Sequence, residues 1–196
     1  MRYNYYLQDL NLIHGTRNFK NKRKKVKYDK MLHFTRTFGY RYCLGNLMDI
    51  SVKGHRSAKL KDEVATAAEF YGSILLPRGI AKNVVLDIEL KGKLDDSAAG
   101  YCEYSEKQGH VKFFVIELDK KEKKEDMLKN LAHEMVHLKQ FALGELSNGF
   151  VFSRSTSWHD RRFDDSKVDY WDQPWEIEAY GREIGLYARY VETFGC

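Results

Sequence analysis

The 196-residue chain has few cysteines and no long apolar run. Its three cysteines, Cys43, Cys102 and Cys196, lie far apart and outside any C-x-x-C pair, which argues against a disulfide framework and a thiolate zinc knuckle. The first residues, MRYNYYLQDL, lack the apolar segment of a signal peptide, and runs such as FFVI are too short to span a bilayer. We therefore expect a soluble protein of a reducing cytoplasm, with no membrane partner.

Positive charge is concentrated near the start of the chain. Residues 1–60 contain 14 Lys and Arg against 3 Asp and Glu, a net charge of +11, whereas the remaining residues contain 19 against 25, a net charge of −6. The densest run, RNFKNKRKKVKYDK at residues 17–30, is interleaved with aromatic side chains and can attract the phosphates of a nucleic acid by releasing counterions. Because no nucleic-acid-binding motif accompanies it, a solvated arm is the simpler interpretation.

The hydrophobic pattern predicts an α+β fold without internal repeats. Alternating apolar positions predict three short strands, expected to form an antiparallel meander, at residues 83–92, 99–106 and 110–119. Helical spacing and end signals predict three helices: residues 62–77, a helix that follows the lysine-rich segment and ends near Ala142 before Gly144, and a last helix that begins at Pro174.

The change in character near residue 61 predicts two regions. Residues 1–60 are expected to be a basic N-terminal region, part of it flexible, and residues 61–196 a folded domain. Residues 145–172 are polar, contain several tryptophans and are expected to be an irregular loop.

The segment NLAHEMVHLKQF, in the second expected helix, carries the main chemical signal. His133 and His137 are four residues apart, so their imidazoles lie on one helix face and can bind one ion, as zinc requires. Glu134 is rotated by about 100° around the helix axis, which places it beside the ion as a general base for a zinc-activated water. The alternative is a polar seam of histidines packed against loops.

A catalytic zinc needs a third protein ligand, and the residues leave three candidates for it. Glu178 in the last helix is favoured, because Ala179 and Gly181 beside it leave room for close helix packing. Glu176 would point about 200° away from Glu178 around the axis and could instead bond a ligand histidine. His159 is the third candidate.

The two motifs HEMVHLKQ and YWDQPWEIEAYGRE together resemble a group of small metallopeptidases encoded by tailed bacteriophages, which are similar to the SprT-like and ImmA/IrrE-type zincins. The resemblance covers roughly residues 60–190. It implies a minimal zincin-like fold, in which a small antiparallel or mixed sheet packs on the HExxH helix and on a C-terminal helix. It also implies a gluzincin site, with His133, His137 and a glutamate of the EIEA segment as ligands and Glu134 as the base.

The SprT-like enzymes take their third ligand from a histidine, and HDRRF at residues 159–163 is similar to their His-x-x-x-Phe segment. If the chain is encoded by a phage, its location is the host cytoplasm. The basic run at residues 17–30 has no counterpart in the shared motifs, so the resemblance implies nothing about it.

Zinc-dependent hydrolysis of peptide bonds is the function that these residues favour, with Zn²⁺ as cofactor and a protein or peptide as substrate. Tyr170, Tyr180 and His159 are candidates for stabilising the oxyanion, although a half-buried position in a hydrophobic seam is the favoured interpretation for both tyrosines. We expect the strand at residues 111–118 to form the sheet edge that binds an extended substrate. The alternative function is a nucleic-acid-associated binding protein with a structural zinc and a basic N-terminal arm.

Overall fold

The computed structural model describes residues 47–92, 94, 100–148, 155–164 and 166–195. The basic run at residues 17–30 lies outside these residues. The described elements are β1 (Asp49–Lys53), α1 (Ala58–Leu75), α2 (Arg78–Ala81), β2 (Val84–Lys91), β3 (Gly100–Gln108), β4 (Val111–Asp119), α3 (Lys124–Leu143), β5 (Leu146–Asn148), β6 (Ser155–Trp158), β7 (Arg161–Asp164), the 3-10 helix η3 (Tyr170–Asp172) and α4 (Pro174–Phe194).

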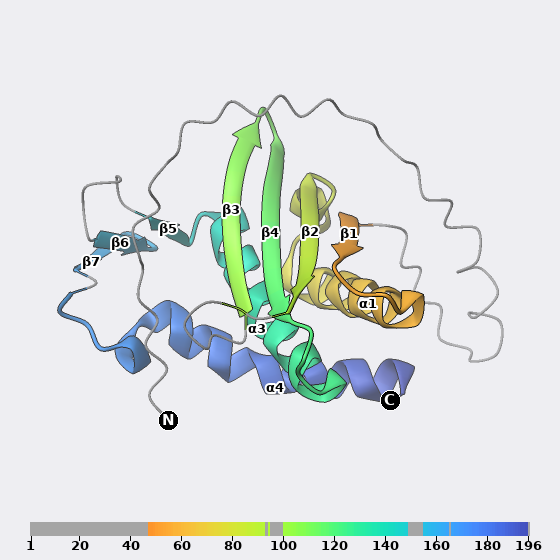
Figure 1. Cartoon of the computed structure of the whole chain (residues 1–196). Helices are drawn as coiled ribbons and strands as arrows, with labels where there is room; N and C mark the ends of the chain where they lie inside the picture. Colours follow the sequence, from red (N-terminus) through yellow and green to blue (C-terminus); the bar gives the residue numbers. More distant parts are fainter. Residues whose placement is uncertain (1–46, 93, 95–99, 149–154, 165, 196) are drawn as a thin grey trace. The chain divides into compact units, whose positions relative to one another are not determined.

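A four-stranded mixed sheet with the order β1-β2-β4-β3 confirms the α+β class (Figure 1). Strands β1, β2 and β4 are parallel to one another, and β3 is antiparallel to β4. The expected antiparallel meander is therefore wrong, because β4 lies between β2 and β3. Strand β4 is rich in Val, Ile and Phe and suits an interior position, whereas the more polar β3 is one of the two outer strands of this sheet among the described residues, with β1 as the other. The expectation that residues 111–118 form the edge is wrong for the same reason.

Strand β1 lies within the range expected to be the basic N-terminal region. It pairs in parallel with β2, and the neighbouring Met48 is buried in the core. The folded part of the chain therefore includes residues before the expected boundary at residue 61.

One face of the sheet forms the core with α1 and α3, and α4 packs on α3 (Figure 1). The two central strands bury their apolar inward side chains: Val84, Leu86, Ile88, Leu90, Phe114, Ile116 and Leu118. Helix α3 is covered by the sheet on one side and by α4 on another, so its polar side chains from His133 to Gln140 lie in or near the interior.

The ends of α3 and α4 follow their sequence signals. Glu125 and Asp126 lie in the first turn of α3, where they favour the positive end of the helix dipole. Gly144 ends α3 in the left-handed conformation with φ 74°, which glycine adopts without steric cost. Pro174 occupies the first turn of α4, as predicted.

Part of the expected irregular loop is ordered as a small second sheet with the order β5-β6-β7. His159 and Asp160 connect β6 to β7, and His159 adopts a positive φ of 51°. Strands of three and four residues carry too little alternation to be recognised from their sequence alone. Trp158 and Phe163 of this sheet pack against Trp175 at the start of α4.

Candidate metal centre

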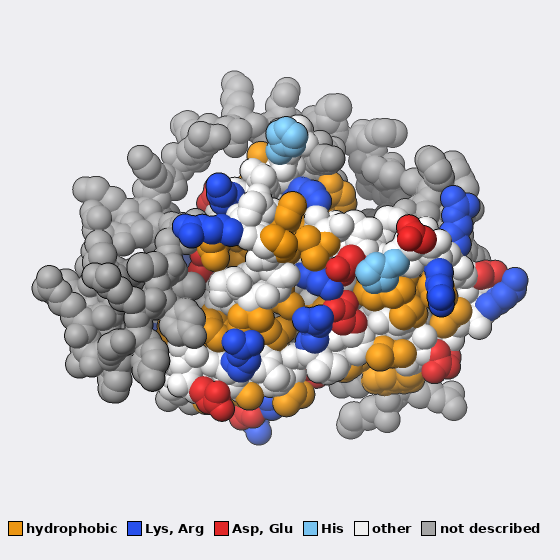
Figure 2. All heavy atoms as spheres, turned by 180° about the vertical axis from the view of Figure 1, so that it is seen from behind, with side chains coloured by type: hydrophobic (Ala, Val, Ile, Leu, Met, Phe, Trp, Pro, Cys, Tyr) orange, Lys and Arg blue, Asp and Glu red, His pale blue; other side chains and the backbone are white. Residues whose placement is uncertain are grey.

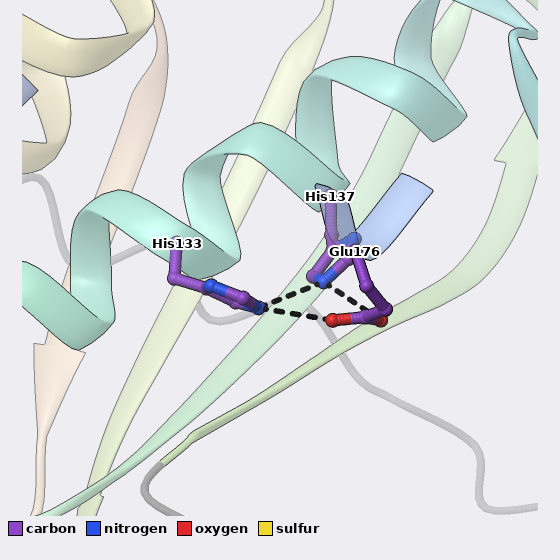
Figure 3. A group of neighbouring side chains, drawn as sticks. All are labelled: His133, His137 and Glu176. Atoms are coloured by element: carbon purple, nitrogen blue, oxygen red, sulfur yellow. Dashed lines mark hydrogen bonds and ion pairs between the residues drawn. The ribbon is translucent and has the colours of Figure 1, made fainter. Parts of the chain in front are cut away.

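The two histidines of α3 point toward one another on the same side of the helix (Figure 3). Their Nε2 atoms are 3.1 Å apart, and their ring centroids are 4.8 Å apart. This follows from the four-residue spacing, which stacks the two side chains on one helix face. His133 and His137 therefore converge as the sequence predicted.

Glu176, from the first turn of α4, completes the group (Figure 3). Its two carboxylate oxygens lie 3.4 Å from the Nε2 atoms of His133 and His137, one oxygen to each ring. One ligand atom from each of the three residues lies within 4.8 Å of the others. The side chains are 8%, 12% and 11% exposed for His133, His137 and Glu176, so the group is largely withdrawn from water.

The outer nitrogen of His133 is held by a carboxylate. The Nδ1 atom lies 2.9 Å from Oε2 of Glu183, and a carboxylate accepts only, so the Nδ1–H donates. The Nε2 lone pair of the neutral ring then faces the group. Glu183 lies seven residues after Glu176 on α4, and this two-turn spacing is the signal in the sequence that could have indicated its role.

The outer nitrogen of His137 is held by Gln140, which is fully buried. The amide nitrogen of Gln140 donates to the Trp175 carbonyl at 2.9 Å and to Oε2 of Glu178 at 3.1 Å. Because both of these partners are acceptors, the amide oxygen must face His137, whose Nδ1 lies 2.9 Å away. The Nδ1 of His137 therefore carries the proton, and its Nε2 lone pair also faces the group. Sequence reasoning did not identify Gln140.

Two lone pairs and a carboxylate that face one another repel unless a cation or a proton lies between them. Without a metal, protons serve this purpose: burial alone would lower the pKa of His133, but its bonds to Glu176 and Glu183 raise it to about 10. Burial would likewise lower the pKa of His137, but its interaction with Glu176 outweighs this effect and raises the pKa. The pKa of Glu176 is lowered well below its usual range, because the two histidines outweigh the effect of its burial.

These donors fit a divalent metal ion. Some catalytic zinc sites use two imidazole nitrogens and one carboxylate as ligands, and a partner on the other nitrogen of each imidazole orients the ring. The same donors also suit other first-row divalent ions. Among the described residues the group offers three possible ligands, whereas a structural zinc usually has four.

Glu134 leaves the helix in a different direction and lies against β3. A Cβ atom on Gly100 would come within 2.8 Å of Oε1 of Glu134, so the carboxylate packs directly on the strand backbone. Glu134 is 5% exposed, and burial raises its pKa. Its charge interacts with those of His133 and His137, and Glu134 is not one of the three residues of the group. Gly100 was not identified from the sequence.

The structure does not bring Glu178 to the histidines, which corrects the prediction of Glu178 as third ligand. Glu178 accepts hydrogen bonds from Lys139 and Gln140 and pairs with Arg182. These partners outweigh its burial and lower its pKa. The buried stripe of α4, which includes Trp175 and Ala179, separates the two glutamates on opposite flanks. Glu176 lies on the flank that faces His133 and His137.

The three candidates for oxyanion stabilisation are in different places. Tyr170 donates from its hydroxyl to Oε2 of Glu176 at 2.5 Å, and its oxygen lies 3.4 Å from the Tyr180 hydroxyl. The ring of Tyr180 contacts the ring of His133 edge-on, with centroids 4.6 Å apart. His159 is exposed in the turn between β6 and β7, where it packs on Trp158 and is not part of the ligand group.

Comparison of the chain with protein-family models, with curated proteins and with solved structures found no match. Within the part of the chain that the structure describes, no helix combines the length and the apolar character needed to cross a bilayer. Side chains of both charge signs lie among hydrophobic patches on the face shown in Figure 2. The expected nucleic-acid contact through residues 17–30 falls outside the described residues and stays a prediction.

Proposed function

We propose that this chain is a zinc-dependent metallopeptidase with a minimal zincin-like fold. The observation that carries the proposal is the convergence of His133, His137 and Glu176 beside the buried carboxylate of Glu134. Each imidazole has its outer nitrogen occupied, so both inner nitrogens are available to one cation. The cytoplasmic location expected from the sequence accompanies this proposal.

A bound zinc ion supplies a Lewis acid that polarises a carbonyl and makes water a nucleophile near neutral pH. The residues of the chain perform the remaining work. His133, His137 and Glu176 hold the ion, and Glu183 and Gln140 hold the two imidazoles in the tautomer that ligation requires.

Glu134 is the general base and acid in this proposal. Its carboxylate accepts a proton from the attacking water and returns it to the leaving amine as the peptide bond breaks. Burial raises the pKa of Glu134, which makes the carboxyl a better proton acceptor than an exposed glutamate. The contact with Gly100 holds the carboxylate beside the ligands rather than on them.

Tyr180 is the favoured residue for stabilising the developing oxyanion. Its ring lies against His133, and its hydroxyl is near the Tyr170 hydroxyl, whereas the Tyr170 hydroxyl is already used by Glu176. A phenolic O–H can donate to an oxyanion without changing its own charge.

The outer strand β3 is the favoured binding edge for an extended peptide. It is the last strand of the sheet among the described residues, and its first residue, Gly100, touches the general base. A peptide that pairs with this edge through main-chain hydrogen bonds would pass directly beside Glu134.

Metal analysis and hydrolysis assays of the purified full chain test the proposal. We expect zinc close to one equivalent, hydrolysis of casein or of a peptide library, and loss of hydrolysis with a chelator that zinc addition reverses. Glu134→Gln should keep the metal and lose at least a hundredfold in hydrolysis, whereas His137→Ala should lose the metal. Full hydrolysis by the Glu134→Gln variant would show that the assigned base is wrong.

A further inference from the structure

Trp171 is a large, mostly exposed aromatic side chain that contacts Tyr170 and Tyr180, which in turn contact Glu176 and His133. It is 56% exposed, whereas Trp175, four residues later, is 6% exposed. An exposed tryptophan is informative, because burying this side chain would remove a large apolar surface from water. The exposed part of the Trp171 ring is therefore apolar surface that a bound molecule could cover.

Two hydrogen bonds fix the short helix η3, which carries Trp171. Asp169 caps the turn, and its Oδ1 accepts from the Trp171 backbone N–H at 3.1 Å. The neighbouring Tyr170 is bonded to the ligand Glu176 at 2.5 Å. The turn that carries Trp171 is therefore attached to the ligand group.

The ring of Trp171 also belongs to a continuous aromatic path that ends at a metal ligand. It packs on Tyr180 with centroids 5.1 Å apart and an interplanar angle of 38°. Tyr180 in turn contacts His133 at 4.6 Å. A substrate side chain that lies on this path is one aromatic ring away from a ligand histidine.

We propose that Trp171 and Tyr180 form a subsite for an aromatic or large aliphatic side chain of the substrate, next to the bond that is cut. This inference rests on the proposed peptidase function and adds its side-chain preference. Tyr170 and Tyr180 cover part of the Trp171 ring, and a substrate side chain that covers the exposed remainder gains apolar contact. The carboxylates of Glu176 and Glu183 nearby disfavour an acidic side chain at this position.

The first measurement compares the zinc-loaded full chain with its Trp171→Ala variant on matched peptides that carry Phe, Leu, Ala, Lys or Asp at one position beside the scissile bond. We expect wild type to prefer Phe and Leu over Ala by about tenfold or more in kcat/KM, which is the discrimination that one apolar pocket provides. In the variant this ratio should fall toward one while the zinc content stays at one equivalent.

Ile177→Ala is the matched control, because Ile177 is also 56% exposed and lies on the same helix as the ligand Glu176. It should leave the Phe-to-Ala ratio unchanged. An unchanged ratio in Trp171→Ala, an equal loss in Ile177→Ala, or a preference of wild type for Lys through a cation–π contact would overturn the proposed subsite.

The second measurement does not depend on hydrolysis. The same peptides are titrated into zinc-loaded Glu134→Gln protein, with and without Trp171→Ala, and dissociation constants are measured by fluorescence anisotropy of a labelled peptide. Tighter binding of the Phe peptide that requires Trp171 supports the subsite even if wild type cleaves nothing, in which case the peptidase proposal alone fails. Binding that is the same for all peptides, or independent of Trp171, refutes the subsite.

Discussion

Gln140 offers the sharpest test of how the interior of this protein orients the histidines of the proposed metal site. Gln140→Leu keeps a similar volume but removes three hydrogen bonds, to His137, to the Trp175 carbonyl and to Glu178. Glu178 retains Lys139 and Arg182, so two groups lose a buried partner: the His137 N–H and the Trp175 carbonyl.

The expected loss of stability follows from these two groups. A buried polar group without a partner costs about 1–3 kcal/mol, so at about 1.5 kcal/mol for each of the two groups the free energy of unfolding should fall by about 3 kcal/mol. For a folded unit of this size, the midpoint of thermal unfolding should fall by roughly 6–12 °C. Circular dichroism of the metal-free protein measures this change.

The metal affinity should fall independently of stability. Without the oxygen of Gln140, the His137 ring is free to turn and to place its proton on either nitrogen, and loss of such a partner typically costs about 10–100-fold in affinity. Competition against a chromophoric chelator measures the zinc dissociation constant at a temperature where each variant is fully folded.

Gln140→Glu separates the two effects. A carboxylate still accepts from His137, but it cannot donate to the Trp175 carbonyl, and it repels Glu178. This variant should lose at least as much stability as Gln140→Leu while its zinc affinity stays within about threefold of wild type, because the imidazole is still oriented. If Gln140→Leu binds zinc as tightly as wild type, the orienting role of Gln140 is refuted, whatever its stability.

Three further predictions address the ligands and the base. Glu176→Gln should lower zinc affinity by at least tenfold, whereas Glu178→Gln, on the other flank of α4, should destabilise the fold and leave zinc affinity nearly unchanged. Atomic absorption after dialysis measures the zinc that each variant retains. A larger loss of zinc in Glu178→Gln than in Glu176→Gln would restore Glu178 as the ligand. Gly100→Ala should lower kcat at full zinc content, because its Cβ would meet Oε1 of Glu134 at 2.8 Å, while Gly92→Ala, whose nearest contact would be 3.5 Å, serves as the control and should retain wild-type kcat. Zinc binding at pH 7.5 should release protons, because the pKa of His133 is raised to about 10 in the metal-free chain and ligation requires its neutral ring. Calorimetry in buffers of different ionisation enthalpy measures the number of protons released. Zinc binding without proton release would contradict the proposed ligation by His133.

Local sequence determined the parts of this protein that depend on one helix alone. His133 and His137 share a face, and Glu134 departs from it, because the helical repeat allows no other arrangement. The end of α3 at Gly144 and the start of α4 at Pro174 also follow from the conformations that these two residues favour.

Tertiary structure alone decided which partners meet these residues. The sequence favoured Glu178 over Glu176 because of its small neighbours, but the choice between them depends on how α4 is rotated about its axis when it packs on α3. That rotation is set by the buried stripe of Trp175, Ala179 and Leu186, and by the bonds of Glu178 to Lys139 and Gln140. The interior position of β4 was also decided by tertiary structure, because the order of the strands depends on which strands pair with the most apolar one. The local sequence pattern determines which residues share a face of a helix or strand, but the pairing of elements distant in sequence is determined only by how they pack in the core.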